Sequence, residues 1–478
     1  MRNLWSYSNA SRLLRRATFR VPTNPTFGTS YRDTVEGISG LVAYWRLSSS
    51  SVVLDEVAGS PPPNPTHPQA YVYPYTSGDN TTVSTGPTLE SAVNAAPAGR
   101  HVKLNANISG QTMTFSGSGS QGSPIVIRPV GSLLTQTMTD CTINITGNWL
   151  VLAGFSLPRC QIVVTGDNNR ITRNDWSTID KPCIILEDGC VGIRIDHNRA
   201  RNVIGFANFI RWFNTNNGGP TNCLVDYNYC HDAPINPTNG TECFRYGMGG
   251  AGIKNALNMN TYLHKNLIQN WDSDDEVLTV KARGLVSEGN TVDCGGHATA
   301  PNNQCNWSMR TASAIFKSDW IGANMRWMRV LGEGGQAHGC RLNGGAELGV
   351  WAGDVLQTNI DNNNGGVVNG SYPASRNAVI NGCVIASTRN ISVGQSFGLP
   401  QGVPIDEPAT NTLIAACTNG SGGALSVGAG ITLVSGRETG TTVTGTASES
   451  FTAATQLVAG EVGTGSFDPY HNDSGPSW

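Results

Sequence analysis

The chain has 478 residues, of which 31 are Lys or Arg and 34 are Asp or Glu, so its formal net charge is −3. Charged residues make up 14% of it, against about 25% in an average globular protein, and 57 residues are glycine. This composition excludes a coiled coil, a helical bundle and a disordered charged tail. It also excludes an electrostatic nucleic-acid binder, which needs a basic excess. A chain poor in charge and rich in Gly, Asn, Ser and Thr is typical of β-structure with many turns.

Neither a membrane span nor a disulfide framework is predicted. No stretch approaches the ~18 consecutive apolar residues that indicate a transmembrane helix. The first ten residues have no apolar core and are followed by Arg12, Arg15 and Arg16, so we expect no signal peptide. The 12 cysteines stand singly, without a CxxC pair. In a chain of this length we expect them to be buried, small apolar residues rather than disulfides or metal ligands.

Residues 1–87 differ from the rest of the chain. They contain a proline-rich run over 61–68 and an aromatic run over 71–75. Proline runs favour extended, non-helical chain. We therefore expect this region to be an attachment segment followed by a linker.

A short amphipathic helix is predicted over 88–96, with Thr88 as its N-cap. It is followed by a predicted strand at 102–104. A short helix ahead of a long β-region is typical of the cap that covers the open end of a solenoid. We expect the β-domain to span residues 88–440, with a C-terminal cap or tail over 441–478.

From about residue 100 the sequence alternates short strands with turns, and apolar residues recur with period 2. A unit that ends in asparagine recurs at intervals of 24, 30, 38 and 24 residues, ending at Asn174, Asn198, Asn228, Asn266 and Asn290. Such a repeat is the signature of a parallel β-helix. Asparagine suits a position that stacks on its counterpart in each coil, because its amide both donates and accepts hydrogen bonds.

The predicted fold class is all-β: a right-handed parallel β-helix (solenoid) with an N-terminal capping helix. A β-propeller or a β-sandwich is the alternative, but either would show even hairpin spacing with Asn-Gly turns. Weaker repeats at 378–383 and 411–415 extend the solenoid toward the C-terminus.

Charge is concentrated in three segments that the repeat places on successive coils. The segments are 239–247, 272–281 and 306–310. Side chains alternate between the faces of a strand, so Asp274 and Glu276 would point the same way in an extended segment. With Glu242 and the oxygen of Asn239 one coil away, they would form an all-oxygen set that suits Ca²⁺. The alternative is a solvated acidic turn.

These segments resemble the active-site strands of polysaccharide lyase family 6, which contains alginate lyases and chondroitinase B. Residues 239–242, Asn-Gly-Thr-Glu, resemble the family's Asn-Gly-Gly-Glu strand. Asp274 and Glu276, with Lys281 five residues after the second acid, resemble its acid-x-acid strand. Arg310 resembles the arginine of its third strand. The resemblance covers residues 88–400 and also implies a parallel β-helix.

The resemblance implies a lyase that cleaves a uronic-acid polysaccharide by Ca²⁺-assisted β-elimination. The implied ligands of the ion are Asn239, Glu242, Asp274 and Glu276. Lys281 would remove the C5 proton of the sugar, and Arg310 would assist the departure of the O4 leaving group. The residues expected to bind substrate are Arg245, His297 and Arg341.

The chain departs from the family pattern at several positions. Thr311 stands where the family often has histidine, and Asp274 stands where glutamate is usual. Residues 294–303 look like an insertion, which contains His297. Two alternatives to a lyase therefore stay open: a non-catalytic receptor-binding or structural fibre, and a glycoside hydrolase with carboxylates about 5–9 Å apart.

We expect the protein to act on a virus particle, such as a phage tail, or outside the cell. The separate N-terminal segment and the absence of a recognisable signal peptide favour delivery on a particle. By analogy with tail spikes we expect a homotrimer that degrades an acidic surface polysaccharide. No nucleic-acid or membrane partner is predicted.

Overall fold

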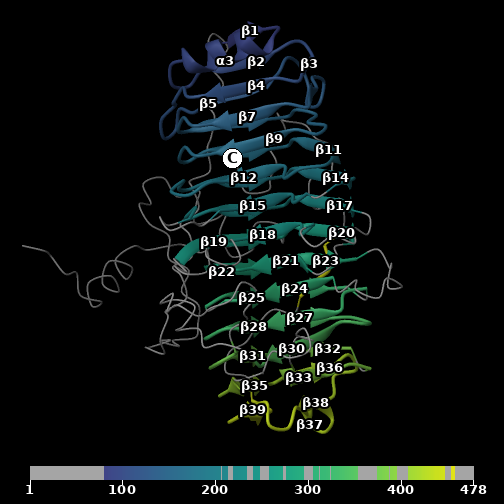
Figure 1. Ribbon diagram of the computed structural model, residues 1–478. Helices are drawn as coiled ribbons and strands as arrows, with labels where there is room; N and C mark the ends of the chain where they lie inside the picture. The colour runs from purple at the N-terminus through teal and green to yellow at the C-terminus, as the bar shows by residue number, and fades with distance from the viewer. Residues whose placement is uncertain are drawn as a thin grey trace, which may run out of the picture. The chain divides into compact units, whose positions relative to one another are not determined.

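The structure is a computed structural model, and it describes residues 80–205, 207–213, 219–233, 241–247, 258–272, 276–294, 305–311, 313–322, 324–353, 374–386, 388–395, 407–446 and 454–457. Within these ranges nearly every element is a β-strand, and the strands stack as successive parallel coils (Figure 1). Residues 1–79 of the predicted attachment segment lie outside these ranges, as does most of the predicted C-terminal tail.

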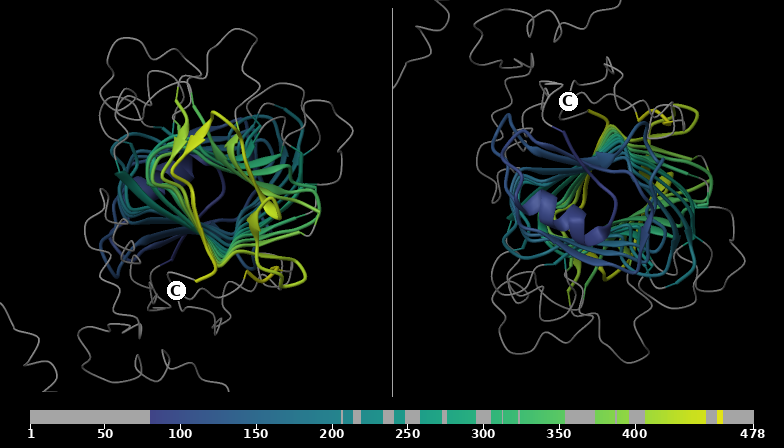
Figure 2. Two further views of the ribbon diagram at one scale, coloured as in Figure 1. Left: turned by 90° about the horizontal axis from the view of Figure 1, so that it is seen from below. Right: turned by 90° about the horizontal axis from the view of Figure 1, so that it is seen from above.

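The strands form three long parallel sheets that enclose the interior of the stack (Figure 2). The 14-stranded sheet consists, in spatial order, of β1 (Asn80–Val83), β2 (His101–Leu104), β5 (Ile125–Pro129), β8 (Leu150–Ala153), β10 (Arg170–Thr172), β13 (Arg194–Asp196), β16 (Leu224–Asp226), β19 (Asn258–His264), β22 (Arg283–Glu288), β25 (Ile315–Lys317), β28 (Gln336–His338), β31 (Val379–Asn381), β35 (Leu413–Ala415) and β40 (Thr442–Thr444). The nine-stranded sheet consists of β11 (Asp175–Ile179), β14 (Arg199–Val203), β17 (Tyr229–Ala233), β20 (Leu267–Trp271), β23 (Thr291–Asp293), β26 (Trp320–Ile321), β29 (Arg341–Leu342), β32 (Val384–Ile385) and β36 (Thr418–Asn419).

The 13-stranded sheet consists of β37 (Ser426–Val427), β38 (Gly430–Leu433), β33 (Ile391–Gln395), β30 (Glu347–Trp351), β27 (Trp327–Val330), β24 (Asn306–Met309), β21 (Glu276–Val280), β18 (Phe244–Tyr246), β15 (Ile210–Trp212), β12 (Ile184–Leu186), β9 (Gln161–Val164), β7 (Thr142–Ile145) and β4 (Thr112–Phe115). Two short pairs are β3 (Ile108–Ser109) with β6 (Met138–Thr139), and β34 (Ala409–Thr410) with β39 (Glu438–Thr439). This architecture confirms the prediction of an all-β fold built of parallel strands.

Alternation of apolar and polar residues gives each strand an inward and an outward face. In β15, Ile210 and Trp212 are buried in the core and the half-buried Arg211 lies between them. In the next coil, β18 repeats the pattern with Arg245 between two buried aromatic residues. Because parallel pairing aligns Arg211 with Arg245, polar side chains of successive coils stand beside one another on the outer face.

A ladder of buried asparagines runs along the corner between the 14-stranded and nine-stranded sheets. The backbone N–H of each of the first four donates to the side-chain oxygen of the next at 2.8–3.0 Å, in the order Asn174, Asn198, Asn228, Asn266 and Asn290. Each of these four side-chain amides also donates to the next side-chain oxygen. The ladder ends where Asn290 donates to Asp319 Oδ1 at 2.8 Å. The predicted stacking of this position is therefore confirmed.

The turn before each ladder residue explains why a hydrogen-bonding side chain is needed there. The preceding residue adopts a left-handed conformation, with φ between 50° and 55° at Arg173, His197, Tyr227 and Lys265. Such a conformation is unfavourable for residues other than glycine by about 1–2 kcal/mol. The ladder hydrogen bonds satisfy the backbone that this sharp turn exposes, and so offset that strain.

The helix α3 (Gly86–Asn94) packs Leu89 and Val93 against the core of the first coils, at the N-terminal end of the stack (Figure 2). It starts two residues before the predicted position, because Thr85 rather than Thr88 is the N-cap. Thr85 Oγ1 accepts a hydrogen bond from the backbone N–H of Thr88 at 3.3 Å, and Thr88 Oγ1 accepts one from the N–H of Thr85 at 3.1 Å. The solenoid also includes β1, which pairs with β2 ahead of the predicted boundary.

All 12 cysteines lie among the described residues as buried thiols, which confirms the prediction that they are interior residues. Three of them, Cys340, Cys383 and Cys417, continue the ladder position beyond Asp319, each directly after a residue of positive φ. In the part of the chain that the structure describes, no helix has the length and apolar character that a membrane crossing requires.

Candidate active site

The predicted catalytic pair lies at the C-terminal ends of two interior strands of the 13-stranded sheet. Lys281 directly follows β21 and Arg310 directly follows β24, and these two strands are neighbours. The backbone N–H of Lys281 donates to the backbone carbonyl of Tyr246 in the preceding coil at 2.7 Å. The backbone N–H of Arg310 likewise donates to the carbonyl of Val280 at 2.8 Å. These bonds continue the parallel ladder, so the two side chains leave the sheet in equivalent positions one coil apart.

Two carboxylates approach the same face from the opposite ends of the strands. Glu276 is the first residue of β21 and is aligned with Asn306 of β24. Glu242 lies two residues ahead of β18, in the preceding coil. Each of the two glutamates is only 3% exposed. A carboxylate buried to this degree needs a cation or hydrogen-bond donors beside it.

Each of these carboxylates is matched by a cation from the following coil. Lys281 Nζ lies 4.0 Å from Oε1 of Glu242. Arg310 donates to Oε1 of Glu276, and Nη1 of the buried Arg329 lies 3.5 Å from the same oxygen. The arrangement holds Arg310 in a fixed orientation, because its guanidinium is bound on the side of the buried acid.

A further residue, Asn208, fixes the position of Glu242. Its Nδ2 donates to Oε2 of Glu242 at 3.2 Å and to the Glu242 backbone carbonyl at 2.8 Å. Asn208 is itself 1% exposed. Glu242 is therefore held between an amide from the coil before it and the ammonium group from the coil after it.

The environment of Lys281 changes its acid–base behaviour. The residue is 8% exposed. Burial, and next the positive charge of Arg310, lower the pKa of Lys281 to about 8, although Glu276 and Glu242 act in the opposite direction. Desolvation disfavours the ammonium form. The neutral amine is thus populated near neutral pH, and a neutral amine is the form that acts as a base.

Among the described residues, positive charges outnumber negative charges on this face. Among the described residues its cations are Arg211, Arg245, Lys281, Arg310 and Arg329. Burial, and then the neighbouring Arg245, lower the pKa of Arg211, which reflects the crowding of like charges. The Nε of Arg245 is buried and has no hydrogen-bond partner among the described residues. An excess of positive charge of this kind attracts an anionic ligand.

Not every predicted site residue belongs to this cluster. Asn239, Asp274 and His297 lie outside the described residues. Arg341 is described, but it lies in β29 of the nine-stranded sheet, where its Nε donates to Asn343 Oδ1 at 3.2 Å. The structure thus places Arg341 on another wall of the solenoid than Lys281 and Arg310. Its assignment as a substrate-binding residue of this site is corrected on that ground.

Sequence reasoning missed Asn208, Arg211 and Arg329. A signal for the two arginines exists in the pattern, because each stands between two apolar residues of a strand, as Arg245 does. Successive side chains of a strand point to opposite faces, so a cation between two inward-pointing apolar residues points outward. No comparable signal marks Asn208, which precedes its strand.

The fit of the implied Ca²⁺ can be tested on the two described carboxylates. Ca²⁺ takes roughly six to eight oxygen ligands. Glu242 and Glu276 offer oxygens of the right kind from adjacent coils, and their neighbouring cations already offset part of their charge. The described residues thus supply two carboxylates of the implied set, each already paired with a cation, and Asn239 and Asp274 lie outside the described ranges.

No protein-family model matches the chain, and no curated protein sequence matches it. Solved structures similar to it are lyases of polysaccharide lyase family 6. The PL6 family polysaccharide lyase Pedsa3628 from Pseudopedobacter saltans has a TM-score of 0.54 and 12% identity, over 81% of this chain and 99% of that one. The PL6 alginate lyase AlyGC has a TM-score of 0.58 and 16% identity, over 81% of this chain and 58% of that one.

A mannuronic acid-specific family 6 lyase from the human gut microbiota has a TM-score of 0.56 and 16% identity, over 75% of this chain and 82% of that one. At such identities the similarity establishes the fold alone. The chain therefore shares the parallel β-helix architecture of the family 6 polysaccharide lyases.

Proposed function

We propose that this protein is a polysaccharide lyase that cleaves a uronic-acid-containing glycan by β-elimination. One observation carries the proposal: a buried lysine whose pKa is lowered to about 8 stands one coil from an arginine held by a buried glutamate. Hydrolysis by paired carboxylates needs neither cation. The excess of arginines on this face suits an acidic polysaccharide, and the structural neighbours named as alginate lyases share the fold.

Lys281 is the base of the proposed reaction. Its neutral amine takes the proton from C5 of the uronate, next to the sugar carboxylate. The electron pair of the C5–H bond becomes the C4=C5 double bond, and the C4–O4 bond breaks, so its electron pair leaves with O4. Lys281 ends as the ammonium ion, which Glu242 stabilises from 4.0 Å.

Arg310 acts at the leaving group. Arginine stays protonated in proteins, so it stabilises the negative charge that develops on O4 by hydrogen bonding, and water supplies the proton. Glu276 is a positioning residue, because it binds Arg310 and not the sugar in this account. The positive charge of Arg245 helps to lower the pKa of Lys281. Its Nε has no hydrogen-bond partner among the described residues and is available to bind a sugar carboxylate.

Ca²⁺ belongs to the proposal as a cofactor, with Glu242 and Glu276 as ligands together with Asn239 and Asp274. When bound, such an ion neutralises the uronate carboxylate and makes the C5 proton more acidic. His297 is proposed as a sugar contact from the insertion. Delivery as a homotrimer on a phage tail or another particle is proposed from the sequence alone.

The proposal is tested by incubating the protein with alginate, polymannuronate, polyguluronate and dermatan sulfate, with added Ca²⁺ or with EDTA. β-Elimination gives products with a C4=C5 double bond, which absorb in the ultraviolet. Saturated products alone would identify a hydrolase. Binding without cleavage of any polymer, by a folded protein, would identify the receptor-binding alternative.

A further inference from the structure

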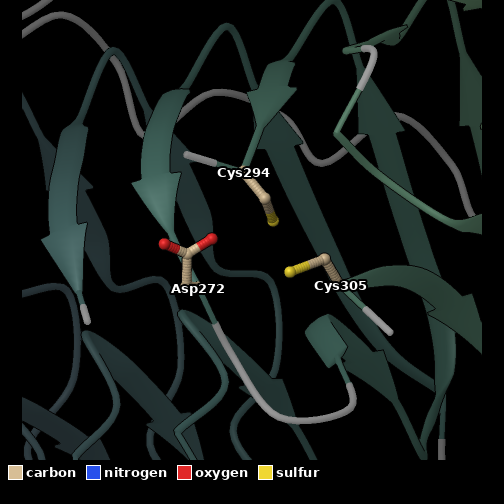
Figure 3. A group of neighbouring side chains, drawn as sticks. All are labelled: Asp272, Cys294 and Cys305. Carbon is tan, nitrogen blue, oxygen red and sulfur yellow. The ribbon is translucent and has the colours of Figure 1, made fainter. Parts of the chain in front are cut away.

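A second cluster of chemically active side chains lies away from the proposed catalytic pair, at the corner where the nine-stranded sheet turns into the 13-stranded sheet. Asp272 directly follows β20, Cys294 directly follows β23, and Cys305 directly precedes β24. One oxygen of the carboxylate and the two sulfur atoms all lie within 4.8 Å of one another. Figure 3 shows the three side chains directed into the same small space.

The three residues come from two successive coils. β20 pairs with β23, and β21 pairs with β24, so Asp272 belongs to one coil and the two cysteines to the next. Cys294 is the first residue of the insertion noted in the sequence, and Cys305 follows the insertion. The fold, and not a local run of sequence, therefore brings the three groups together.

The cluster is buried in the interior of the solenoid. Asp272, Cys294 and Cys305 are each 2% exposed. Cys294 Sγ donates to the Trp271 carbonyl at 3.1 Å and lies 3.3 Å from Sδ of Met325, and both of these neighbours belong to the core. Carboxylate oxygen and cysteine sulfur are both metal ligands, and here they converge from two coils. A bound cation would attract all three groups at once.

Cysteines also lie beside one another elsewhere in the core, as Cys383 does with Cys340 and Cys417, but there no group of three ligand atoms of this spacing forms among the described residues. Cys383 occupies the ladder position, and its thiol donates to the Ala337 and Asn381 carbonyls at 3.5 and 3.7 Å. Such thiols act as small apolar residues with a local hydrogen bond. In the part of the chain that the structure describes, the only group of three or more potential ligands of this spacing is Asp272, Cys294 and Cys305.

We propose that Asp272, Cys294 and Cys305 bind a Zn²⁺ ion. Two thiolates and one carboxylate form the mixed sulfur and oxygen set that this borderline ion accepts, whereas a carboxylate disfavours the softer Cu⁺. Binding converts both thiols to thiolates and releases two protons. The fourth position of a tetrahedral site is left to water or to another neutral ligand.

The proposed ion joins two coils at the corner that leads into β21. Asp272 lies four residues before Glu276, the residue that holds Arg310. An ion bound at Asp272 would therefore fix the start of the segment that delivers Glu276 to the 13-stranded sheet. This role is structural and does not depend on the proposed lyase activity.

The test is the metal content of the full chain, purified without a histidine tag and under reducing conditions. Inductively coupled plasma mass spectrometry should find about one Zn²⁺ per chain, as expected for a single site. Asp272→Asn and the Cys294→Ser/Cys305→Ser double variant should lose most of it. Cys383→Ser, which removes a buried thiol elsewhere in the core, should keep it. Zinc in Cys383→Ser also controls for a general effect of losing an interior thiol.

Substitution with Co²⁺ gives a second readout that does not require activity. The wild-type protein should show a thiolate-to-cobalt charge-transfer band, and the double cysteine variant should not. If the double cysteine variant fails to fold, Asp272→Asn serves in its place, because it keeps both thiols and the side-chain volume. Its affinity for Co²⁺ should be at least tenfold lower than that of the wild type.

Three results would overturn the proposal: a reduced wild-type protein that takes up neither Zn²⁺ nor Co²⁺, a metal content unchanged in all the variants, or a Cys294–Cys305 disulfide in the purified protein. Absence of lyase activity would leave the metal result intact, so the two proposals fail independently.

Discussion

Two of the buried polar regions among the described residues differ in how their side chains are matched. In the asparagine ladder, each amide donates and accepts along the stack, and the same bond is repeated from coil to coil. On the proposed catalytic face, which carries Lys281 and Arg310, the described residues place five cations beside two glutamates, and the identities of the residues change from coil to coil. The first region is electrically neutral and fully matched, whereas the second has an excess of charge.

The difference separates what stabilises the fold from what binds a ligand. A repeated neutral hydrogen bond stabilises every coil in the same way and leaves no group for a ligand. Unequal buried charge is unfavourable in the free protein, and a bound anion relieves it. Substitutions in the ladder should therefore change stability, and substitutions on the catalytic face should change activity first.

The largest effect is expected for Lys281→Ala. Loss of a general base typically lowers the rate about 10²- to 10⁴-fold. The same variant leaves the buried Glu242 without its neighbouring ammonium group, so the melting temperature should fall. Measurement of kcat and Tm on one preparation checks both parts. Arg341→Ala, on the nine-stranded sheet, is the matched control and should keep the wild-type rate.

The pH dependence of the wild-type enzyme sharpens this prediction. Since the pKa of Lys281 is lowered to about 8, the active neutral amine becomes populated as the pH rises through this value. The rate should therefore increase from pH 6 to a plateau above pH 8. A rate that falls over the same interval would contradict a lysine base.

Glu276→Gln is expected to lower both activity and stability. The substitution removes the carboxylate that pairs with both Arg310 and the buried Arg329, so neither guanidinium group keeps this anionic partner. Removing one partner of a buried ion pair typically costs about 3–5 kcal/mol. Denaturant unfolding measures the loss. If Glu276→Gln were as stable as wild type but inactive, the glutamate would act on substrate rather than through Arg310.

Asn228→Ala should destabilise the fold by about 1–3 kcal/mol. It removes the side-chain oxygen that accepts hydrogen bonds from the backbone N–H and the side-chain amide of Asn198. The specific activity of the folded fraction should not change. Asn390→Ala serves as the control, since Asn390 is exposed and its side-chain amide donates to Thr432 Oγ1 at 3.2 Å. Equal losses in the two variants would mean that the ladder has no special role.

The smallest effect concerns the end of the ladder. Burial raises the pKa of Asp319 from 3.8 to about 7. The folded state therefore prefers the protonated acid, so this contribution to stability is full below pH 4 and is lost as the pH rises through 7. Tm should fall over this range in the wild type and less steeply in Asp319→Asn. Parallel curves for the two proteins would contradict the raised pKa.

The sequence predicts the solenoid well because its signals are local and repeated. The recurrence of Asn198, Asn228 and Asn266 identifies the stack directly, and period-2 alternation identifies the strands. The first residue of the helix is not fixed by the sequence, because Thr85 and Thr88 are both residues that favour the N-cap position. The structure uses Thr85.

The candidate site is predictable only in part, for a geometric reason. Lys281 and Arg310 follow short strands of known spacing, so their proximity follows from the repeat. Arg341 obeys the same alternation but lies on another wall, and insertions of varying length hide which of the three walls a strand joins. Arg329 reaches Glu276 across 53 residues, a separation that no local pattern reveals.

The most direct test of the central claim compares wild type and Lys281→Ala on uronate polymers and follows the ultraviolet absorbance of the unsaturated product. The account predicts that the wild type forms this product from at least one polymer, and that Lys281→Ala, folded and able to bind that polymer, forms almost none. Wild-type levels of unsaturated product from Lys281→Ala would contradict it.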